Sequence, residues 1–349
     1  MATTPLHAGV LQIEPTDHCN LACAMCAPHA DRWETVHGVP KGYLDRDVYR
    51  RILHGLVADD LRFDHLILQW LGDPSMHPHL EWMIGEASRV LGERIGYVRF
   101  DSNAVLLTPP RMEQILRELS GAVPLTCVFT LDAVSPETYR RTKGREGLER
   151  ARTHIRHLLA RRRSLADPGQ VRVQVQFVVQ PGNAHEAGDF LAYWTRALTC
   201  TGDGGHGEIL FKPLSVGGGA TGQSAANALY ARTLREAGIT PVVGDTLSVT
   251  VWEDRPWQRD DARGRRTACP GLWYTPVVRQ DGHLVMCCAD LRSELDLGSL
   301  ATEGFRELWE GPRARAERQK HRNGVFEGVC AGCGGINWYV LGEGARALG

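Results

Sequence analysis

The sequence predicts an α/β fold with a largely parallel sheet, followed by a smaller cysteine-rich region. Short β-branched runs alternate with amphipathic helical stretches up to Pro213, and the alternation stops after that residue. The last quarter of the chain is irregular and rich in glycine and cysteine. In a chain of 349 residues we therefore expect a main domain over residues 1–213, a connecting segment over 214–268 and a small domain over 269–349.

Six segments of the first two-thirds are predicted strands. Each is a short run rich in β-branched, aliphatic or aromatic residues. They are Leu11–Thr16, His65–Gly72, Tyr97–Asn103, Leu125–Asp132, Val171–Val179 and Glu208–Pro213. Their alternation with helices favours right-handed βαβ units and a parallel sheet. Six such strands fit an open doubly wound sheet or an incomplete barrel, and periodicity alone does not choose between the two.

Amphipathic helices are predicted between these strands. Asp45–Ala58, Glu146–Ala160 and Glu186–Leu198 each carry apolar residues at helical spacing, which places those residues on one face. Shorter helices are expected at Gln223–Ala237 and around Gly304–Lys320, beyond the region of alternation.

The composition argues against several classes of function. Lys and Arg number 40 against 41 for Asp and Glu, so broad attachment to nucleic acid or to an anionic membrane is not expected. No apolar run reaches the roughly 18 residues of a membrane span, and Met1–Val10 lacks the features of a secretory signal. We therefore expect a cytoplasmic protein.

Ten cysteines are the informative part of the composition. In a chain without a secretory signal they point to metal or redox chemistry. Cys19, Cys23 and Cys26 form a C-x3-C-x2-C motif directly after the first predicted strand. A four-iron cluster normally takes four thiolates, so three would leave one iron open to bind a small molecule. A zinc knuckle is the alternative, but zinc usually takes four ligands and no fourth cysteine follows closely.

The segment Glu14–Cys26, with the sequence EPTDHCNLACAMC, resembles the signature of radical S-adenosylmethionine (SAM) enzymes. Further elements similar to those of this family follow in the family's order. They are Gly72-Asp73-Pro74 for the GEP element, Ser102-Asn103, Thr130-Leu131-Asp132 and Lys143-Gly144. The resemblance implies a partial (β/α)6 barrel, similar to a TIM barrel, and so chooses between the two arrangements above.

The resemblance also implies roles for these residues. The three cysteines would hold a [4Fe–4S] cluster to which SAM binds. Asp73 would orient the SAM amino group, and Lys143, where arginine is common, would meet the SAM carboxylate as a point charge. Thr130 and Asp132 would contact the ribose from one strand face, and the backbone of Met25 would face the adenine. The predicted SAM-binding residues are Met25, Gly72, Asp73, Pro74, Ser102, Asn103, Thr130, Asp132 and Lys143.

A second set of cysteines lies in the last quarter of the chain. The set is Cys269, Cys287, Cys330 and Cys333. The turn sequence Asp281-Gly282 predicts a hairpin that leads to Cys287. This pattern resembles the auxiliary-cluster domains called SPASM and twitch, and it implies that four thiolates close one auxiliary [4Fe–4S] cluster. A structural zinc ribbon has the same ligand count and is the alternative. Cys288 is left over.

The resemblance implies radical chemistry on a small molecule. The first cluster and SAM would generate a 5′-deoxyadenosyl radical that abstracts hydrogen from a C–H bond. An auxiliary cluster near the substrate would accept a second electron, so that an alcohol of a sugar or aminocyclitol becomes a ketone. Enzymes similar to 2-deoxy-scyllo-inosamine dehydrogenase act in this way in antibiotic biosynthesis. A flavodoxin or ferredoxin would supply the electron that cleaves SAM.

Three alternatives to an oxidation remain open. A redox-neutral epimerase would return hydrogen from a cysteine thiol, for which Cys288 is the candidate. A peptide-modifying enzyme and a non-enzymatic zinc-binding module are the others. Lys212, at the end of the last predicted strand, is a candidate to deprotonate or orient a substrate hydroxyl, with a surface ion pair as its alternative role.

Overall fold

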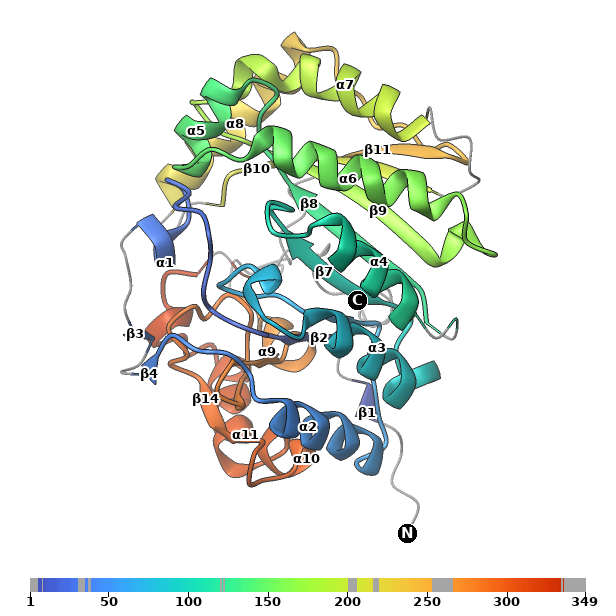
Figure 1. The fold of residues 1–349 in the computed structure, drawn as a ribbon. Helices are drawn as coiled ribbons and strands as arrows, with labels where there is room; N and C mark the ends of the chain where they lie inside the picture. Colours follow the sequence, from blue (N-terminus) through green and yellow to red (C-terminus); the bar gives the residue numbers. More distant parts are fainter. Residues whose placement is uncertain are drawn as a thin grey trace. The chain divides into compact units, whose positions relative to one another are not determined.

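The structure is a computed structural model, and it describes residues 6–7, 9–30, 35–36, 39–119, 121, 123–199, 206–215, 220–252, 266–333 and 335. The chain divides into two units, each made of separate stretches of sequence (Figure 1). The first unit is Met1–His18, Glu34–Val98 and Asp254–Gly349, and the second is Cys19–Trp33 and Arg99–Glu253. The boundaries expected from the sequence at 213 and 268 stay a prediction.

The second unit is built on a sheet of parallel strands. The strands, in spatial order, are β7 (Val98–Ser102), β8 (Leu125–Thr130), β9 (Val171–Val179), β10 (Gly207–Pro213) and β11 (Leu247–Val251). The pairs β8–β9, β9–β10 and β10–β11 are parallel. Because parallel strands end at the same edge, their carboxyl-terminal residues meet there.

One face of this sheet is apolar and carries the helices. Phe177 of β9 and Phe211 of β10 contact Phe190 of α7 (Ala187–Thr199), with ring centroids 4.8 and 6.0 Å away. The same helix buries Trp194 against Phe190. Figure 1 shows α5 (Pro136–Lys143), α6 (Leu148–Arg162) and α8 (Ala220–Glu236) among the helices of this unit. This packing supplies the hydrophobic core of the unit.

The opposite face of the same sheet carries most of its polar side chains. They belong to Arg99, Asp101, Thr130, Gln174, Gln176, Glu208 and Lys212, and the apolar Val128, Val178 and Leu210 lie among them. In the parallel registers, Thr130 lies beside Gln176 and Glu208 beside Gln174. Since successive side chains of a strand point to opposite faces, these residues line one surface. We call this surface the polar sheet face.

The first unit holds a mixed sheet. Its strands, in spatial order, are β6 (His65–Ile67), β2 (Val10–Ile13), β12 (Val277–Val278), β13 (His283–Val285) and β14 (Asp296–Ser299). Strand β2 pairs in parallel with β6 and β12, whereas β13 is antiparallel to both of its neighbours. The antiparallel hairpin carries the segment that leads to Cys287.

Helix α2 (Arg46–Ala58) shows why the helices of the first unit form where the sequence predicts them. Asp45 caps its N-terminus by accepting hydrogen bonds from the backbone N–H groups of Asp47 and Val48, at 2.8 and 3.1 Å. Its buried face includes Tyr49, whose hydroxyl donates to the carbonyl of Met83 in α3 (Leu80–Leu91), 2.9 Å away.

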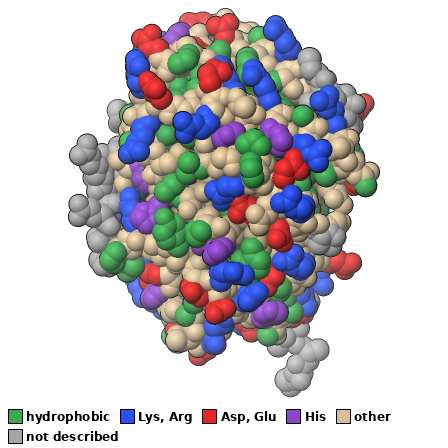
Figure 2. Space-filling view, viewed as in Figure 1, with side chains coloured by type: hydrophobic (Ala, Val, Ile, Leu, Met, Phe, Trp, Pro, Cys, Tyr) green, Lys and Arg blue, Asp and Glu red, His purple; other side chains and the backbone are tan. Residues whose placement is uncertain are grey.

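The remaining elements are short or lie between those already described. They are β1 (Leu6–His7), α1 (Ala27–Ala30), β3 (Thr35–Val36), β4 (Val39–Pro40), β5 (Leu61–Arg62), η1 (Pro74–Met76), η2 (Gly92–Arg94), α4 (Pro109–Glu118), η3 (Pro168–Gln170), η4 (Ala184–Glu186), α9 (Gly271–Tyr274), α10 (Phe305–Trp309), α11 (Pro312–Arg322) and η5 (Gly328–Cys330). None of the helices in the described parts of the chain has both the length and the apolar character of a membrane span. Figure 2 shows basic and acidic side chains interspersed over the face in view.

The α/β class and the mostly parallel strands predicted from the sequence are confirmed, with four differences in detail. The strand expected over residues 11–16 ends at Ile13. The predicted strand that ends at Asp132 stops at Thr130, because Asp132 adopts a φ of +59°. The strand expected over residues 65–72 ends at Ile67. The helix expected around residues 304–320 is two helices, because the chain breaks at Gly311 before Pro312, which lacks a backbone N–H.

Candidate cofactor and cluster sites

The first site is the loop that carries Cys19, Cys23 and Cys26. All three are half-buried, and none is in a disulfide. The loop turns tightly, because the N–H of Cys26 donates to the carbonyl of Cys23 and the N–H of His29 donates to the carbonyl of Cys26, both at 3.0 Å. Three thiols are therefore held on one short turn, which is the donor set that an iron–sulfur cluster with one open iron requires.

The end of helix α5 anchors this cysteine loop. The N–H groups of Ala22 and Ala24 donate to the carbonyls of Lys143 and Thr142, at 3.1 and 3.2 Å. Gly144 follows in the left-handed conformation, with a φ of +70°, and a Cβ there would lie 2.2 Å from the carbonyl oxygen of Ala22. Only glycine fits this position, both for its φ and for the close approach of the two backbones.

Asn103 joins the turn after β7 to the same loop. Its Nδ2 donates to Oδ1 of Asn20 at 2.8 Å, and its Oδ1 accepts from the N–H of Val105 at 3.0 Å. Ser102 accepts from the N–H of Ala104 at 3.1 Å, which holds the turn closed. The two residues predicted from the order of motifs thus lie in a fixed turn, and one of them contacts the cysteine loop.

Asp132 and Lys143 form a buried ion pair. Lys143 Nζ donates to Oδ2 of Asp132 at 2.5 Å, while Oδ1 accepts from the N–H of Val178 at 2.7 Å. Burial works against the charged form of Lys143, but the Asp132 carboxylate, with a smaller contribution from Cys23, raises the lysine pKa above its ordinary value. The pair links β8, β9 and α5 beneath the cysteine loop. Their roles toward the ribose and carboxylate of SAM stay predictions, as does that of Thr130.

Gln180 contacts the loop from the carboxyl end of β9 and was not predicted from the sequence. Its Nε2 lies 3.7 Å from Sδ of half-buried Met25. The N–H of Gln180 donates to Oδ1 of Asn183 at 2.9 Å, which fixes the turn after the strand. The signal that could have found it is its position directly after a predicted strand, at the edge where parallel sheets place their sites.

In the first unit, the element Gly72-Asp73-Pro74 packs against the residues that precede Cys19. The N–H of Asp73 donates to the carbonyl of His18 at 2.9 Å, and a Cβ on Gly72 would lie 2.2 Å from the carbonyl oxygen of Thr16. The buried Asp73 side chain caps η1 by accepting from the N–H and the hydroxyl of Ser75, at 2.9 and 2.5 Å. This fixes the carboxylate; its role toward the SAM amino group stays a prediction.

Glu14, the first residue of the signature segment, ties three loops of the first unit together. Its two oxygens accept from the N–H groups of Leu71 and Gln280, at 2.9 and 3.3 Å. Burial raises its pKa to about 8, and the two backbone hydrogen bonds limit the rise. Glu14 thus connects the end of β2, the Gly72 loop and the turn between β12 and β13.

The second set of thiols converges on one small cavity in the first unit. The residues that line it are Arg266, Cys269, Leu272, Cys287, His321, Cys330, Cys333 and Gly335. All four predicted auxiliary ligands line it, and none of them is in a disulfide. Burial, reinforced by the neighbouring cysteines, raises the pKa of Cys330 to about 12. Cys288 is not among the lining residues; its carbonyl accepts from the indole N–H of Trp70 at 3.0 Å.

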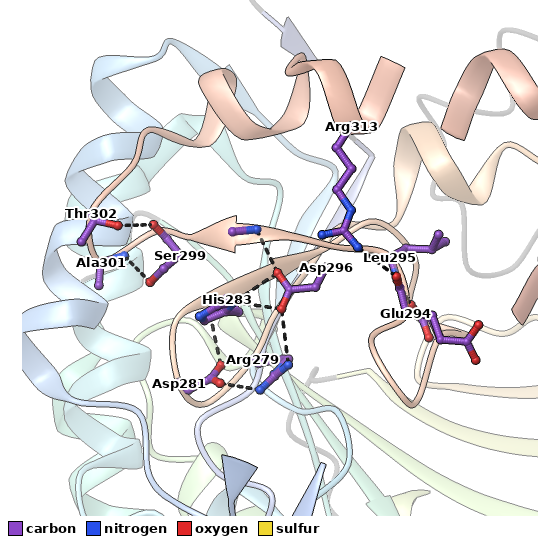
Figure 3. A network of polar contacts seen from close by, with 12 residues as sticks. Arg279, Asp281, His283, Glu294, Leu295, Asp296, Ser299, Ala301, Thr302 and Arg313 are labelled. Carbon is purple, nitrogen blue, oxygen red and sulfur yellow. Dashed lines mark hydrogen bonds and ion pairs between the residues drawn. The ribbon is translucent and has the colours of Figure 1, made fainter. Parts of the chain in front are cut away.

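A polar network holds the hairpin that leads to Cys287 (Figure 3). Arg279 pairs with Asp281 and, at 3.6 Å, with Asp296, while His283 Nδ1 lies 2.9 Å from Asp296 Oδ2. Gly282 has a φ of +82°, which suits the turn. The hairpin turn predicted from Asp281-Gly282 is therefore present.

The donor chemistry of both sites suits iron–sulfur clusters. The sites offer three cysteine thiols on a loop and four around a cavity, and soft thiolates are the ligands that these clusters take. In the part of the chain that the structure describes, no group of three or more His, Cys, Asp or Glu side chains is placed to hold a single metal ion.

Two solved structures, anSMEcpe and SuiB, share the fold of this chain, and a third match is weaker. The structure of a tagged form of anSMEcpe with bound AdoMet matches at a TM-score of 0.61 and 15% identity, over 97% of this chain and 84% of that one. Streptococcus suis SuiB bound to S-adenosylmethionine matches at 0.55 and 12%, over 90% and 68%. BtrN in complex with AdoMet and 2-DOIA matches at 0.48 and 12%, over 92% and 89%. A comparison with curated proteins finds no match.

Family models match the two regions that hold the cysteine sites. Residues 13–166 match the radical SAM superfamily, and this stretch contains the C-x3-C-x2-C loop, Asn103, Asp132 and Lys143. Residues 269–334 match the SPASM iron–sulfur cluster-binding domain, and this stretch contains the four thiols of the cavity. The chain therefore belongs to the radical SAM superfamily, whose domain uses a [4Fe–4S] cluster with SAM, and it carries a SPASM domain for auxiliary iron–sulfur binding.

Proposed function

We propose that this protein is a radical SAM dehydrogenase that oxidises a secondary alcohol of a sugar or aminocyclitol to a ketone, in the biosynthesis of a natural product such as an antibiotic. The observation that carries the proposal is the cavity lined by four free thiols. Four thiolates are enough to ligate one cluster fully, which suits a cluster that exchanges electrons and does not bind substrate.

The proposed ligands follow from the two thiol sets. Cys19, Cys23 and Cys26 hold the first cluster, and the cavity thiols hold the auxiliary one. When bound, the first cluster with SAM supplies the 5′-deoxyadenosyl radical that removes hydrogen from the substrate carbon, and the auxiliary cluster supplies a one-electron acceptor. The residues that we propose to hold SAM are Met25, Gly72, Asp73, Pro74, Ser102, Asn103, Thr130, Asp132 and Lys143.

The polar sheet face supports a hydroxyl-bearing substrate. Arg99 and Asp101 form a two-point ion pair on it, with both N–O distances at 2.6 Å. Gln174 donates to Glu208 at 2.6 Å and accepts from Gln176 at 3.0 Å. Such paired donors and acceptors suit the hydroxyl and amino groups of sugars and aminocyclitols, because polar groups in a binding site select ligands that complete their hydrogen bonds.

Lys212 is the proposed acceptor of the hydroxyl proton. It lies near the end of β10 on the polar sheet face, is half-buried, and makes no ion pair with any other described residue. Burial lowers its pKa, against the opposing effect of Asp101, so the neutral amine is more accessible than in an exposed lysine. In the overall oxidation the carbon gives up a hydrogen atom. The remaining radical then loses one electron and its hydroxyl proton to become the ketone.

The test is turnover by anaerobically reconstituted protein with SAM, dithionite and a panel of sugars and aminocyclitols. We expect about eight irons per chain, which corresponds to two cubane clusters, together with 5′-deoxyadenosine and a ketone product. Zinc without sulfide would instead support the zinc-binding module. Product formed only from peptides would support a peptide-modifying enzyme.

A redox-neutral epimerase is the second candidate, and one observation favours it. Cys288 is not in a disulfide and does not line the four-thiol cavity, so a cluster held by the four cavity thiols leaves its thiol, now hydrogen-bonded to Cys287, as the candidate hydrogen donor. Reactions in deuterated water separate the two functions: solvent deuterium at an inverted carbon, without ketone, supports the epimerase. In that case Cys288→Ala should divert the reaction toward oxidation. We further propose a flavodoxin or ferredoxin as the electron donor; the cytoplasmic location stays a prediction.

A further inference from the structure

We propose that Arg266 is a positioning residue that raises the reduction potential of the auxiliary cluster through a fixed positive charge at the four-thiol cavity. The inference rests on the proposed function to the extent that the cavity thiols hold a cluster. It adds a reason why that cluster accepts an electron from the substrate, and it concerns a residue that none of the sequence motifs includes.

The guanidinium of Arg266 is fixed beside the Cys330-x2-Cys333 segment. Its Nη2 donates to the carbonyl of Cys333 at 3.3 Å and its Nη1 to the carbonyl of Ala331 at 3.4 Å. The guanidinium carbon also lies 3.9 Å from the ring centroid of Phe326, in a cation–π contact. Two hydrogen bonds and one aromatic face hold the charge at the edge of the cavity that the side chain lines.

This charge is not compensated within the described part of the chain. The residues that line the cavity include no carboxylate. Arg266 makes no ion pair with any described acid, and it contacts two backbone carbonyls and one aromatic ring. Among the described residues, no carboxylate therefore offsets its positive charge at the cavity.

The other nitrogen-bearing side chain at the cavity is His321. Its Nδ1 accepts a hydrogen bond from the backbone N–H of Cys269 at 3.4 Å, so a ring proton lies on Nε2. Among the described residues that line the cavity, Arg266 is the one arginine, and there is no lysine and no carboxylate.

A nearby cation favours the reduced form of a cluster. Reduction adds one negative charge, and in a mostly apolar cavity the Coulomb attraction to a guanidinium is weakly screened. Surrounding charge and hydrogen bonds are among the factors that set iron–sulfur potentials. Arg266 is also suited to the task because a guanidinium keeps its charge at any relevant pH.

The test is an EPR-monitored redox titration of the auxiliary cluster in the full-length chain. The parent protein carries Cys19→Ala, Cys23→Ala and Cys26→Ala, so that only the auxiliary cluster contributes a signal. We expect Arg266→Gln to lower the equilibrium constant for reduction at least tenfold, a shift of about 59 mV to more negative potential for one electron. Arg266→Lys keeps the charge and should stay close to the parent value.

Arg313→Gln is the matched control. Arg313 donates to the carbonyl of Glu294 at 3.2 Å (Figure 3). It belongs to the same unit and does not line the cavity. Its removal should leave the potential unchanged. An unchanged potential in Arg266→Gln, or an equal shift in Arg313→Gln, overturns the proposal.

Iron and sulfide analysis guards against a purely structural role. If Arg266→Gln holds no auxiliary cluster, the Arg266→Lys variant is the deciding measurement. An auxiliary cluster at the parent potential in Arg266→Lys supports the proposed effect of the charge, and loss of the cluster in this variant too overturns the proposal. The titration uses no substrate, so it is separate from the dehydrogenase assay. If Arg266→Gln shifts the potential as expected but the wild type forms no ketone, the proposed reaction is refuted and the effect of Arg266 on the potential stands. A parent protein that holds no auxiliary cluster overturns both proposals.

Discussion

Two glycines allow the close backbone contacts on either side of the cysteine motif. Gly144, with its φ of +70°, allows the carbonyl of Ala22 to approach within 2.2 Å of where a Cβ would lie. Gly72 plays the same part in the first unit against the carbonyl of Thr16, also at 2.2 Å. Backbone atoms cannot swing aside as the end of a long side chain can, so an added methyl group must displace the loop itself.

Gly144→Ala should therefore damage the first cluster selectively. We expect iron content to fall from about eight toward four per chain, and 5′-deoxyadenosine formation to fall at least tenfold. Gly238→Ala is the matched control, because Gly238 has a similar φ of +63° but no atom within 4 Å of its missing Cβ. It should cost only the roughly 1–2 kcal/mol of left-handed strain. Equal iron contents in the two variants would contradict the assignment.

Glu14 should make stability depend on pH. Its pKa in the folded protein is about 8, above the ordinary value of 4.5. The stability that Glu14 contributes is thus fully present below pH 4.5 and is lost as the pH rises through about 8. The thermal-unfolding midpoint of the wild type, relative to Glu14→Gln, should be highest near pH 5 and decline toward pH 8.5. A difference that stays constant over this range would show that Glu14 does not titrate as described.

Lys212 should act late in the reaction. Lys212→Met is expected to leave hydrogen abstraction in place while ketone formation falls about 100-fold, the usual effect of removing a general base. Lys320→Met is the control, since Lys320 is a partly exposed lysine paired with Glu317 on α11. The ratio of ketone to 5′-deoxyadenosine measures the effect. A parallel loss of both products in Lys212→Met would point to substrate binding instead of proton transfer.

At the scale of elements, periodicity located the cores of helices and strands but not their ends. The predicted helix over Asp45–Ala58 is α2 almost without change, because its apolar spacing and its Asp45 cap are both local signals. The predicted strand over His65–Gly72 ends at Ile67, and near its expected end the N–H of Leu71 donates to the Glu14 side chain, far away in the sequence. A local sequence pattern cannot indicate a hydrogen-bond partner that is distant in the sequence.

The Asp132–Lys143 pair joins elements across the second unit, and it can be tested as a link between them. Lys143→Met leaves a buried carboxylate unpaired, which should reduce the free energy of unfolding by roughly 3–5 kcal/mol. Lys143→Met combined with Asp132→Asn removes both charges, and asparagine tolerates the positive φ at this position. Denaturant unfolding of the double variant should recover much of the loss.

A different result for Lys143→Met would indicate that Lys143 binds SAM. If Lys143→Met unfolds like the wild type but no longer cleaves SAM, Lys143 contacts SAM and is not chiefly a structural partner of Asp132. The family resemblance predicts the contact with the SAM carboxylate, whereas the 2.5 Å ion pair favours the structural part.

At the scale of the whole molecule, the order of motifs along the chain predicted most residues of the candidate site. The two cysteine sets, Asn103 and Lys143 were found because each belongs to a spaced pattern. Gln180 and Arg266 were not, since they reach Met25 and Cys333 across 155 and 67 residues, respectively. No local pattern marks them, and only folding brings them to these sites.

The most direct test of the proposed dehydrogenase is to follow hydrogen from a substrate that is deuterated at the carbinol carbon. The reconstituted protein, reduced anaerobically with SAM present, should transfer that deuterium to 5′-deoxyadenosine and form about one ketone for each 5′-deoxyadenosine, as expected when hydrogen abstraction and loss of the second electron are coupled. Labelled 5′-deoxyadenosine without ketone would contradict the oxidation, and the absence of 5′-deoxyadenosine would contradict the radical mechanism itself.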